Sequence, residues 1–375
     1  MNLDYVVLPL VLGIVALAFV TFTVRRFRAL RNGQHSKRRR LSERIALSIA
    51  CLLVVVLAAT SLFNAVAVHL YSRSHPPAGQ LAKVGQYTMH INCIGHGSPV
   101  LVLESGLGDD SLVWANFQPQ LAQTTEICSY DRAGFGWSDT RPAPRDADHI
   151  ATELHQLLVD AAVTDPIILM GHSIAGLYIR DYASHYPSQV AGLIFVDGSS
   201  PFQDKNPALA TVGNGPPAPL IHALLVSGIP RVIGLCSGGN HDAGYAFRKD
   251  RAEHVCSLHF NSVSAELNSF DASSQQVLQS ATYGNIPILV ISHDPAKQLP
   301  PHPAPSDIAA QKAWSGMQSN LKSLSTNSRQ IIATGSGHYV MIDRPDLLEK
   351  EVPLFIQSVR GTAPPAIPNG ATITE

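Results

Sequence analysis

The stretch Ile168–Pro187, ILMGHSIAGLYIRDYASHYP, decides the fold class. An apolar run leads into Gly-His-Ser, and an amphipathic helical pattern follows. This order predicts a buried strand, a sharp turn and a helix, which is the setting of a nucleophilic serine in a G-x-S-x-G turn. Gly171 and Ser173 fit that pattern, but Ala175 occupies its last position and Gly176 comes one residue late. The competing interpretation is a serine that only caps a helix.

The segments around this turn alternate between the two periodicities of secondary structure. Residues 146–163 have helical spacing of apolar side chains, whereas several short runs are almost continuously apolar, as buried parallel strands are. Strands alternating with helices predict an α/β fold with a doubly wound sheet. The runs that we interpret as strands are YTMHINCIG, SPVLVLESG, TEICSYD, PIILMG, VAGLIFVDG, IPILVISHD and RQIIATG.

The strand pattern is interrupted between residues 199 and 284, which are rich in Pro, Gly, Ser and Asn. We interpret this segment as a cap inserted into the sheet domain. The expected division is a linker at 72–82, a first part of the core at 83–198, the cap at 199–284, and a second part of the core at 285–361. Residues 362–375 are rich in Pro and Thr and are expected to be disordered.

Two uncharged apolar segments, residues 5–24 and 45–70, precede the core. About 20 residues at ~1.5 Å each cross the ~30 Å hydrocarbon core of a bilayer, so both are predicted transmembrane helices. A cleaved signal peptide is the alternative for the first, but such a peptide has a basic start, and Asp4 is the only charged side chain before the span.

The charge distribution predicts the orientation of this anchor, residues 1–71. Residues 25–44 carry nine Lys or Arg, which would hold that loop in the cytoplasm and place the large domain outside it. The chain beyond residue 71 has 18 basic and 26 acidic residues, a formal net charge of −8. A nucleic-acid-binding function is therefore excluded for this part.

A serine nucleophile needs a histidine base and an acid that orients the histidine. The chain has 16 histidines, and His338 is the one in a glycine-rich loop between the last predicted strand and the last helix. Asp294 follows the strand ILVIS, and Asp197 ends the strand LIFVD. Both aspartates could reach the histidine. We favour Asp294 as the acid and keep Asp197 as the alternative.

The developing oxyanion needs backbone donors. The turn Ser-Gly-Leu-Gly after the strand PVLVLE offers the N–H of Leu107, and Ile174 directly follows the serine. His241, His254 and His259 could suggest a metal site, but no cysteine or carboxylate spacing supports one, so we expect neither a metal nor an organic cofactor.

These residues together resemble the α/β-hydrolase superfamily. The similarity is strengthened by YDRAGFGWSD from residue 130, by CIGHGSPVLVLESGLGDDSLVW and by GSGHYVMIDRPDLL, and it covers about residues 80–360. The last two segments are similar to a membrane-attached or secreted bacterial branch. The resemblance implies a mostly parallel eight-stranded sheet with an antiparallel second strand, helices on both faces and an inserted cap. It also implies a multi-pass protein of the bacterial plasma membrane.

The resemblance also suggests how the cysteines pair. Cys51 lies in the second predicted span, and the other four cysteines allow three pairings. In the expected sheet the second strand ends near the start of the fourth. The resemblance therefore implies one disulfide between Cys93 and Cys128 and a second between Cys236 and Cys256.

The expected function is hydrolysis of carboxylic esters, as in esterases and lipases, through an acyl-enzyme. The expected partners are a small-molecule or lipid-like ester and, through the anchor, a membrane. Acyl transfer to an alcohol and perhydrolysis would use the same residues. A non-catalytic binding or sensor domain on the same fold is the alternative from a different class.

Overall fold

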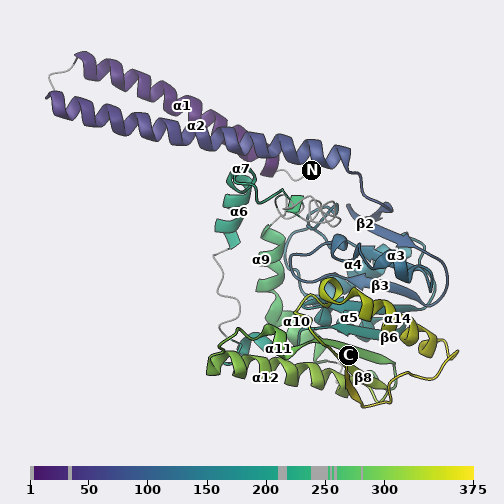
Figure 1. Ribbon diagram of the computed structural model, residues 1–375. Coiled ribbons are helices and arrows are strands. Elements are labelled where there is room, and N and C mark those ends of the chain that lie inside the picture. Colours follow the sequence, from purple (N-terminus) through teal and green to yellow (C-terminus); the bar gives the residue numbers. More distant parts are fainter. Residues whose placement is uncertain are drawn as a thin grey trace. The chain divides into compact units, whose positions relative to one another are not determined.

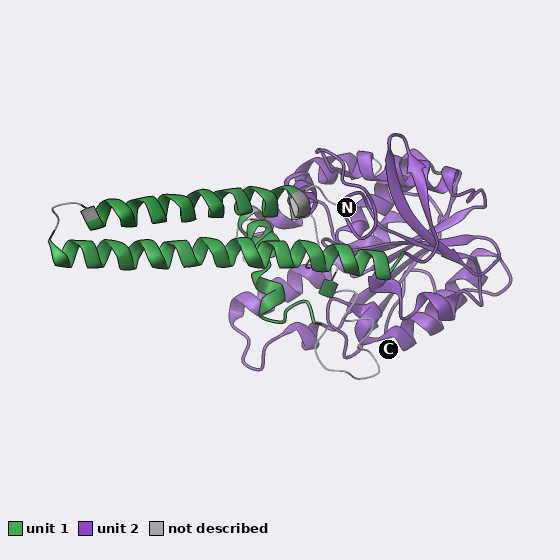
Figure 2. Cartoon of the chain, turned by 90° about the horizontal axis from the view of Figure 1, so that it is seen from above, with its two compact units in different colours: residues 1–76, 216–260 green, residues 77–215, 261–375 purple. Residues whose placement is uncertain are grey.

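A computed structural model describes residues 4–32, 36–209, 218–237, 252–253, 256, 260–279 and 282–375. The chain forms two compact units, coloured separately in Figure 2. The first unit combines residues 1–76 with 216–260, and the second combines residues 77–215 with 261–375. The second unit holds the sheet and is described first.

The sheet of the second unit has nine strands in the order β1-β2-β4-β3-β5-β6-β7-β8-β9 (Figure 1). β2 runs antiparallel to both of its neighbours, and all later neighbours pair in parallel. The expected mostly parallel sheet with an antiparallel second strand is confirmed. The strands are β1 Gln80–Val84, β2 Tyr87–Ile94, β3 Val100–Glu104, β4 Ile127–Tyr130, β5 Ile167–His172, β6 Val190–Val196, β7 Ile288–His293, β8 Ser328–Ala333 and β9 Thr372–Thr374.

Helices cover both faces of the sheet, which is why the central strands are apolar along their whole length. On one face Val102 of β3 lies in a cluster with Leu154 of α4. On the other face Leu101 lies in a cluster with Val352 of α14. The described helices are α1 Asp4–Asn32, α2 Lys37–Ser74, η1 Ser111–Trp114, α3 Gln118–Leu121, α4 Ala147–Asp160, α5 Ala175–His185, η2 Gln203–Lys205, α6 Ala218–Val226, α7 Ile229–Val232, α9 Phe260–Asn268, α10 Phe270–Val277, α11 Pro295–Gln298, α12 Pro305–Asn320, η3 Leu321–Leu324, α13 Val340–Asp343 and α14 Pro345–Val359.

The C-terminal tail differs from expectation. Residues 362–375 were expected to be disordered, but Thr372–Thr374 form β9 beside β8, so the sheet has nine strands rather than eight. The β-branched sequence Thr-Ile-Thr suits a strand. Ile367 is buried in the core cluster that contains residues of α14, so the segment between α14 and β9 packs on the core. The Pro- and Thr-rich composition of the tail predicted disorder, so this short edge strand was not predicted.

The boundaries of the cap and of the linker also differ. β1 begins at Gln80, inside the segment expected to be a linker. Residues 216–260 belong to the unit of the N-terminal helices, whereas α10 and all of α9 after its first residue belong to the sheet unit. α10 packs against α4 and α5, and Phe270 and Val277 share an apolar cluster with Ile150. The segment 199–284 is therefore divided between two units rather than forming one cap.

The first unit contains two long apolar helices. Val7–Arg31 and Lys37–Ser74 reach mean hydropathies of 2.6 and 2.7, and by length and composition both could cross a membrane, although a signal sequence meets the same test for the first. The described part of the basic segment is helical rather than a loop, since the two helices extend to Asn32 and from Lys37. The side chain of Ser36 caps the second helix by accepting from the N–H of Arg39.

The structure pairs the cysteines as expected. Cys93 and Cys128 are register partners on β2 and β4 and form a disulfide. Cys236 and Cys256 form the second disulfide. Cys51 in α2 is the free thiol.

A thiol titration tests this pairing. The unreduced chain, denatured in the presence of a thiol reagent, should show one reactive thiol, and the reduced chain should show five, the full cysteine count. Cys51→Ser is the matched control and should remove the single thiol of the unreduced chain. Three or five thiols before reduction would contradict one or both disulfides.

Candidate active site

Ser173 lies on the expected turn between β5 and α5. Its φ is +55°, a conformation that a residue other than glycine adopts at a cost and that is typical of strained functional turns. Two backbone bonds to the neighbouring strand region hold the turn. The N–H of Ser173 donates to the carbonyl of Val196 at 3.1 Å, and the N–H of Ser199 donates to the carbonyl of Ser173 at 2.7 Å. The turn is thereby fixed with the serine at its tip.

The displaced glycine of this turn has a packing role. A Cβ on Gly171 would lie 3.0 Å from the carbonyl oxygen of Ala175, so the first glycine lets the helix begin close to the strand. A Cβ on Gly176 would lie 3.0 Å from the backbone N and O of Ser199. Glycine at 176 therefore lets α5 approach the loop after β6. Ala175 is fully buried and its methyl group fits the apolar cluster there.

Three side chains form a hydrogen-bonded chain at the carboxyl ends of β5, β6 and β8. The Nε2 atom of His338 lies 3.0 Å from Oγ of Ser173. The Nδ1 atom of the same ring lies 2.5 Å from Oδ2 of Asp197. Asp197 is fully buried, whereas the His338 side chain is 30% exposed. The order of acid, imidazole and hydroxyl is the one that activates a serine.

The structure does not bring Asp294, the aspartate favoured from the sequence, to the histidine. Its carboxylate accepts from the N–H of Ala296, at the start of α11, and from the N–H of Gly335. These bonds hold the pKa of the Asp294 carboxyl below its usual value. The preference for Asp294 therefore needs correction, because its carboxylate caps a helix and Asp197 is the acid in contact with His338.

Asp197 is held by more donors than His338 alone. Nδ1 of His293 lies 2.7 Å from Oδ2, and the indole N–H of Trp314 donates to Oδ1 at 2.9 Å. Burial opposes ionisation of Asp197, but the hydrogen bonds from His293 and His338 outweigh it and lower the pKa of the carboxyl. Burial also opposes charge on His293, yet its bond to Asp197 raises the pKa of that ring. Asp197 is therefore a carboxylate over the working range of pH.

The two residues expected to donate to the oxyanion are associated with one apolar cluster. Leu107 packs against the apolar cluster that contains Ile174. Within the described part of the chain, neither backbone N–H donates to a backbone carbonyl. Their assignment as oxyanion donors stays a prediction.

A buried ionic network fixes the turn that carries Leu107. The guanidinium of Arg132 donates to the carbonyls of Ser105 at 2.5 Å and Gly106 at 2.8 Å. It also pairs with Glu104 at 2.8 Å and with Glu266 of α9 at 2.8 Å. Burial raises the pKa of the Glu104 carboxyl despite its contact with the guanidinium. The network orients the donor turn and joins it to α9.

Sequence reasoning missed Arg132, Glu266 and His293 as parts of the site. Arg132 lies in the segment YDRAGFGWSD, which pointed to the family but not to a role for its arginine. Glu266 comes from a segment without a readable pattern. His293 immediately precedes Asp294. Successive side chains of a strand point to opposite faces, and the sequence does not show which of these two faces Asp197.

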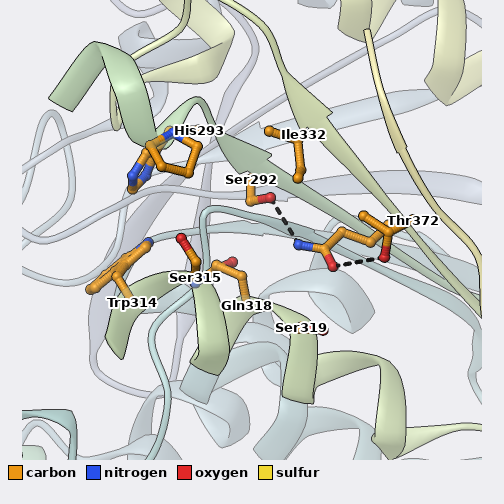
Figure 3. Close-up of a pocket in the computed structure, with 10 residues that line it drawn as sticks. Ser292, His293, Trp314, Ser315, Gln318, Ser319, Ile332 and Thr372 are labelled. Carbon is orange, nitrogen blue, oxygen red and sulfur yellow. Dashed lines mark hydrogen bonds between the residues drawn. The ribbon is translucent and has the colours of Figure 1, made fainter. Parts of the chain in front are cut away.

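A cavity of about 180 Å³ lies behind the acid, between α12 and the ends of β7 and β8 (Figure 3). His293 and Trp314, which bind Asp197, lie at one side of it, and Ser292 and Gln318 line it further in. Ser173 is not among its lining residues. We therefore do not assign this cavity to the substrate.

The site includes three side chains of types that can ligate a metal ion. Asp197, His293 and His338 converge closely enough to ligate an ion. However, Nδ1 of each ring already lies at hydrogen-bond distance from Oδ2 of Asp197. These distances are those of hydrogen bonds. His241, His254 and His259, the histidines weighed from the sequence, lie outside the described residues.

Comparison with known proteins gives the same fold. The family described as alpha/beta hydrolase fold matches residues 99–218. A probable transporter, efuK, of Hormonema carpetanum is 32% identical over 140 residues, 35% of this chain and only 20% of the transporter's length. An AB hydrolase superfamily protein of Gibberella zeae is 25% identical over 294 residues, 70% of this chain and 87% of that protein.

A solved structure extends the comparison. An esterase from Thermogutta terrifontis superposes with a TM-score of 0.54 at 20% sequence identity, over 75% of this chain and 99% of the esterase. At that identity the similarity concerns the fold.

The contact at Gly176 gives a testable prediction. In Gly176→Ala the added Cβ would press on backbone atoms of residues 198 and 199, which cannot rotate away. We expect a loss of about 1–3 kcal/mol in the free energy of unfolding. Gly316→Ala is the matched control, because Gly316 lies in α12 with open space around it and alanine there should gain up to ~1 kcal/mol.

The measurement is the Tm of both variants in detergent. A Tm for Gly176→Ala equal to or above that of the wild type would contradict the close approach of α5 to the loop after β6.

Proposed function

Because this chain belongs to the α/β-hydrolase superfamily and is a hydrolase, we propose that it cleaves carboxylic esters through Ser173, His338 and Asp197. The observation that supports this most directly is the unbroken chain of hydrogen bonds from the Ser173 hydroxyl to the buried Asp197 carboxylate. The similarity in fold to an esterase from Thermogutta terrifontis agrees with this proposal.

The proposed reaction proceeds in two halves. Oγ of Ser173 attacks the ester carbonyl as Nε2 of His338 takes the hydroxyl proton, and Asp197 stabilises the resulting imidazolium. The N–H groups of Leu107 and Ile174 bind the oxyanion. His338 then returns the proton to the leaving alcohol, which departs and leaves an acyl group on Ser173. Water, activated by the same imidazole, releases the acid and restores the serine.

The geometry argues against one of the two alternatives to hydrolysis. An acyltransferase or perhydrolase would use the same residues and differ only in the acceptor. A binding domain without activity has no need for a strained serine turn, yet Ser173 keeps its positive φ and its contact with His338.

We also propose that the N-terminal unit anchors the enzyme in a bacterial plasma membrane. Two helices of sufficient length and hydropathy, with nine basic residues around their connection, support a double span with that connection in the cytoplasm. The catalytic unit would then lie on the opposite side, where the two disulfides are stable. A lipid-like ester suits this location.

A comparison of two aspartate variants tests the assignment of the acid. Asp197→Asn removes the charge that stabilises the imidazolium and should lower kcat for a p-nitrophenyl ester by on the order of 10³–10⁴-fold. Asp294→Asn is the matched control. Among the described residues, the Asp294 carboxylate accepts from the backbone N–H groups of Ala296 and Gly335, so this change should leave kcat within a few fold.

Ser173→Ala gives the background rate in this assay. The reverse order, a large loss in Asp294→Asn and a small one in Asp197→Asn, would refute the assignment. Activity that survives in Ser173→Ala would refute the proposed nucleophile.

A pH profile tests the role of His293. Its hydrogen bond withdraws charge from the Asp197 carboxylate, so His293→Phe should let Asp197 stabilise the imidazolium of His338 more strongly. The acidic limb of kcat/KM should therefore move to higher pH. His293→Asn, which can still donate, should move it less.

His293 should also make the free energy of unfolding depend on pH. Since the pKa of folded His293 is raised, its contribution is complete below the unfolded value of about 6.5 and is lost as the pH rises through the folded value. The stability difference between wild type and His293→Phe should therefore shrink with rising pH. Thermal unfolding of both proteins across this pH range measures the difference. In the activity profile, an acidic limb of kcat/KM that does not move in His293→Phe would show that His293 does not act through Asp197.

A further inference from the structure

Two polar residues of α2 are buried inside the apolar span. Ser61 is fully buried and Asn64 is 1% exposed, while Leu62 and Phe63 between them are 56% and 55% exposed. Residues three apart lie on the same face of a helix. At this level of the span the covered face therefore carries two polar side chains, whereas the apolar Leu62 and Phe63 are open.

The polar face binds the end of α6. The hydroxyl of Ser61 donates to the carbonyl of Val226 at 3.0 Å, and Nδ2 of Asn64 donates to the carbonyl of Leu225 at 3.2 Å. The last carbonyls of a helix have no partner within the helix. In hydrocarbon such groups must find a partner in the protein, and α2 supplies two.

The turn after α6 lies directly against the backbone of α2. Gly228 has φ +77°, and a Cβ there would lie 2.1 Å from the carbonyl oxygen of Thr60. No side chain other than hydrogen fits this contact. The position of the turn on the span is therefore fixed by backbone packing as well as by the two side-chain bonds.

The single charged group of this segment is neutralised. Residues 218–237 contain one Lys, Arg, Asp or Glu, which is Arg231. Its guanidinium pairs with both carboxylate oxygens of Glu253, at 2.8 and 2.6 Å, and donates to Oδ1 of Asn64 at 2.7 Å. The Arg231 side chain is 9% exposed. A charge so paired and covered can be held next to a bilayer.

The outer surface of α6, α7 and the turn after them is apolar. Six large aliphatic side chains are 42–66% exposed there, which would be costly in water for a surface of this kind. They are Leu220, Leu224, Ile229, Val232, Ile233 and Leu235. We call residues 218–237 the apolar hairpin.

We propose that the apolar hairpin lies in the hydrocarbon of the bilayer beside α2, with the acyl chains of lipids covering its exposed side chains. This inference rests on the proposed membrane anchor. The middle of the predicted span 45–70 falls near residue 57, so Ser61 and Asn64 lie about 5–10 Å along the helix from it. The hydrocarbon extends ~15 Å from its middle, so the attachment points are inside it.

The depth of attachment is what selects lipid over a protein partner. A soluble partner could not reach a surface bonded to the span at Ser61 and Asn64 without entering the bilayer. The hairpin would thus be a membrane-inserted element contributed by the segment that interrupts the hydrolase sheet. An enzyme anchored this way can meet amphiphilic esters where they are dissolved.

Fluorescence quenching in the full chain tests the inference. Single cysteines replace Leu224 and Val232 in a Cys51→Ala background, are labelled with an environment-sensitive nitrobenzoxadiazole dye, and are reconstituted in phosphatidylcholine nanodiscs. Doxyl-labelled lipid and aqueous iodide then serve as quenchers. We expect both hairpin positions to be quenched several-fold more by doxyl lipid, relative to iodide, than a matched label at Val159. Val159 is an exposed valine of α4 in the catalytic unit.

A label at Val56, an exposed residue of the span, separates the two proposals. If Val56 responds to lipid and either hairpin position responds like Val159, the hairpin is in water and this inference is wrong, while the anchor stands. If Val56 itself responds like Val159, the membrane anchor is wrong and the inference fails with it.

Discussion

The site depends on one buried carboxylate. Asp197 follows β6 with φ +47°, and it accepts hydrogen bonds from His338 in the loop after β8, from His293 at the end of β7 and from Trp314 of α12. Removing this carboxylate from water is costly unless every oxygen is paired. The same bonds that compensate for its burial therefore bring the ends of three strands and one helix together and set the imidazole against Ser173.

The fold and most of the site could be predicted from sequence because they follow from local patterns. Apolar runs marked the strands, and a strand-to-helix turn marked Ser173. The choice of acid could not be made this way, since Asp197 and Asp294 both follow strands and only the direction of each side chain separates them. β9 was missed because Thr-Ile-Thr suits a strand but is only three residues long, in a Pro- and Thr-rich tail, and its pairing with β8 is not visible in the sequence.

Within each of the two units, buried polar groups find partners that fix a backbone segment. Arg132 satisfies two carbonyls of the donor turn, and the buried Glu104 and Glu266 hold its charge. In the N-terminal unit Ser61 and Asn64 satisfy the carbonyls at the end of α6. In each place a few polar contacts fix a backbone segment whose own sequence has no strong conformational preference.

The central claim is that Ser173 is a nucleophile activated by His338. Mapping the adduct of a fluorophosphonate probe tests it most directly, because the probe reacts with an activated serine and not with an ordinary hydroxyl. The account predicts one adduct per chain, on the peptide that contains Ser173, and its loss in His338→Ala with the fold intact. A folded wild-type protein that gives no adduct, or an adduct on another serine, would contradict the account.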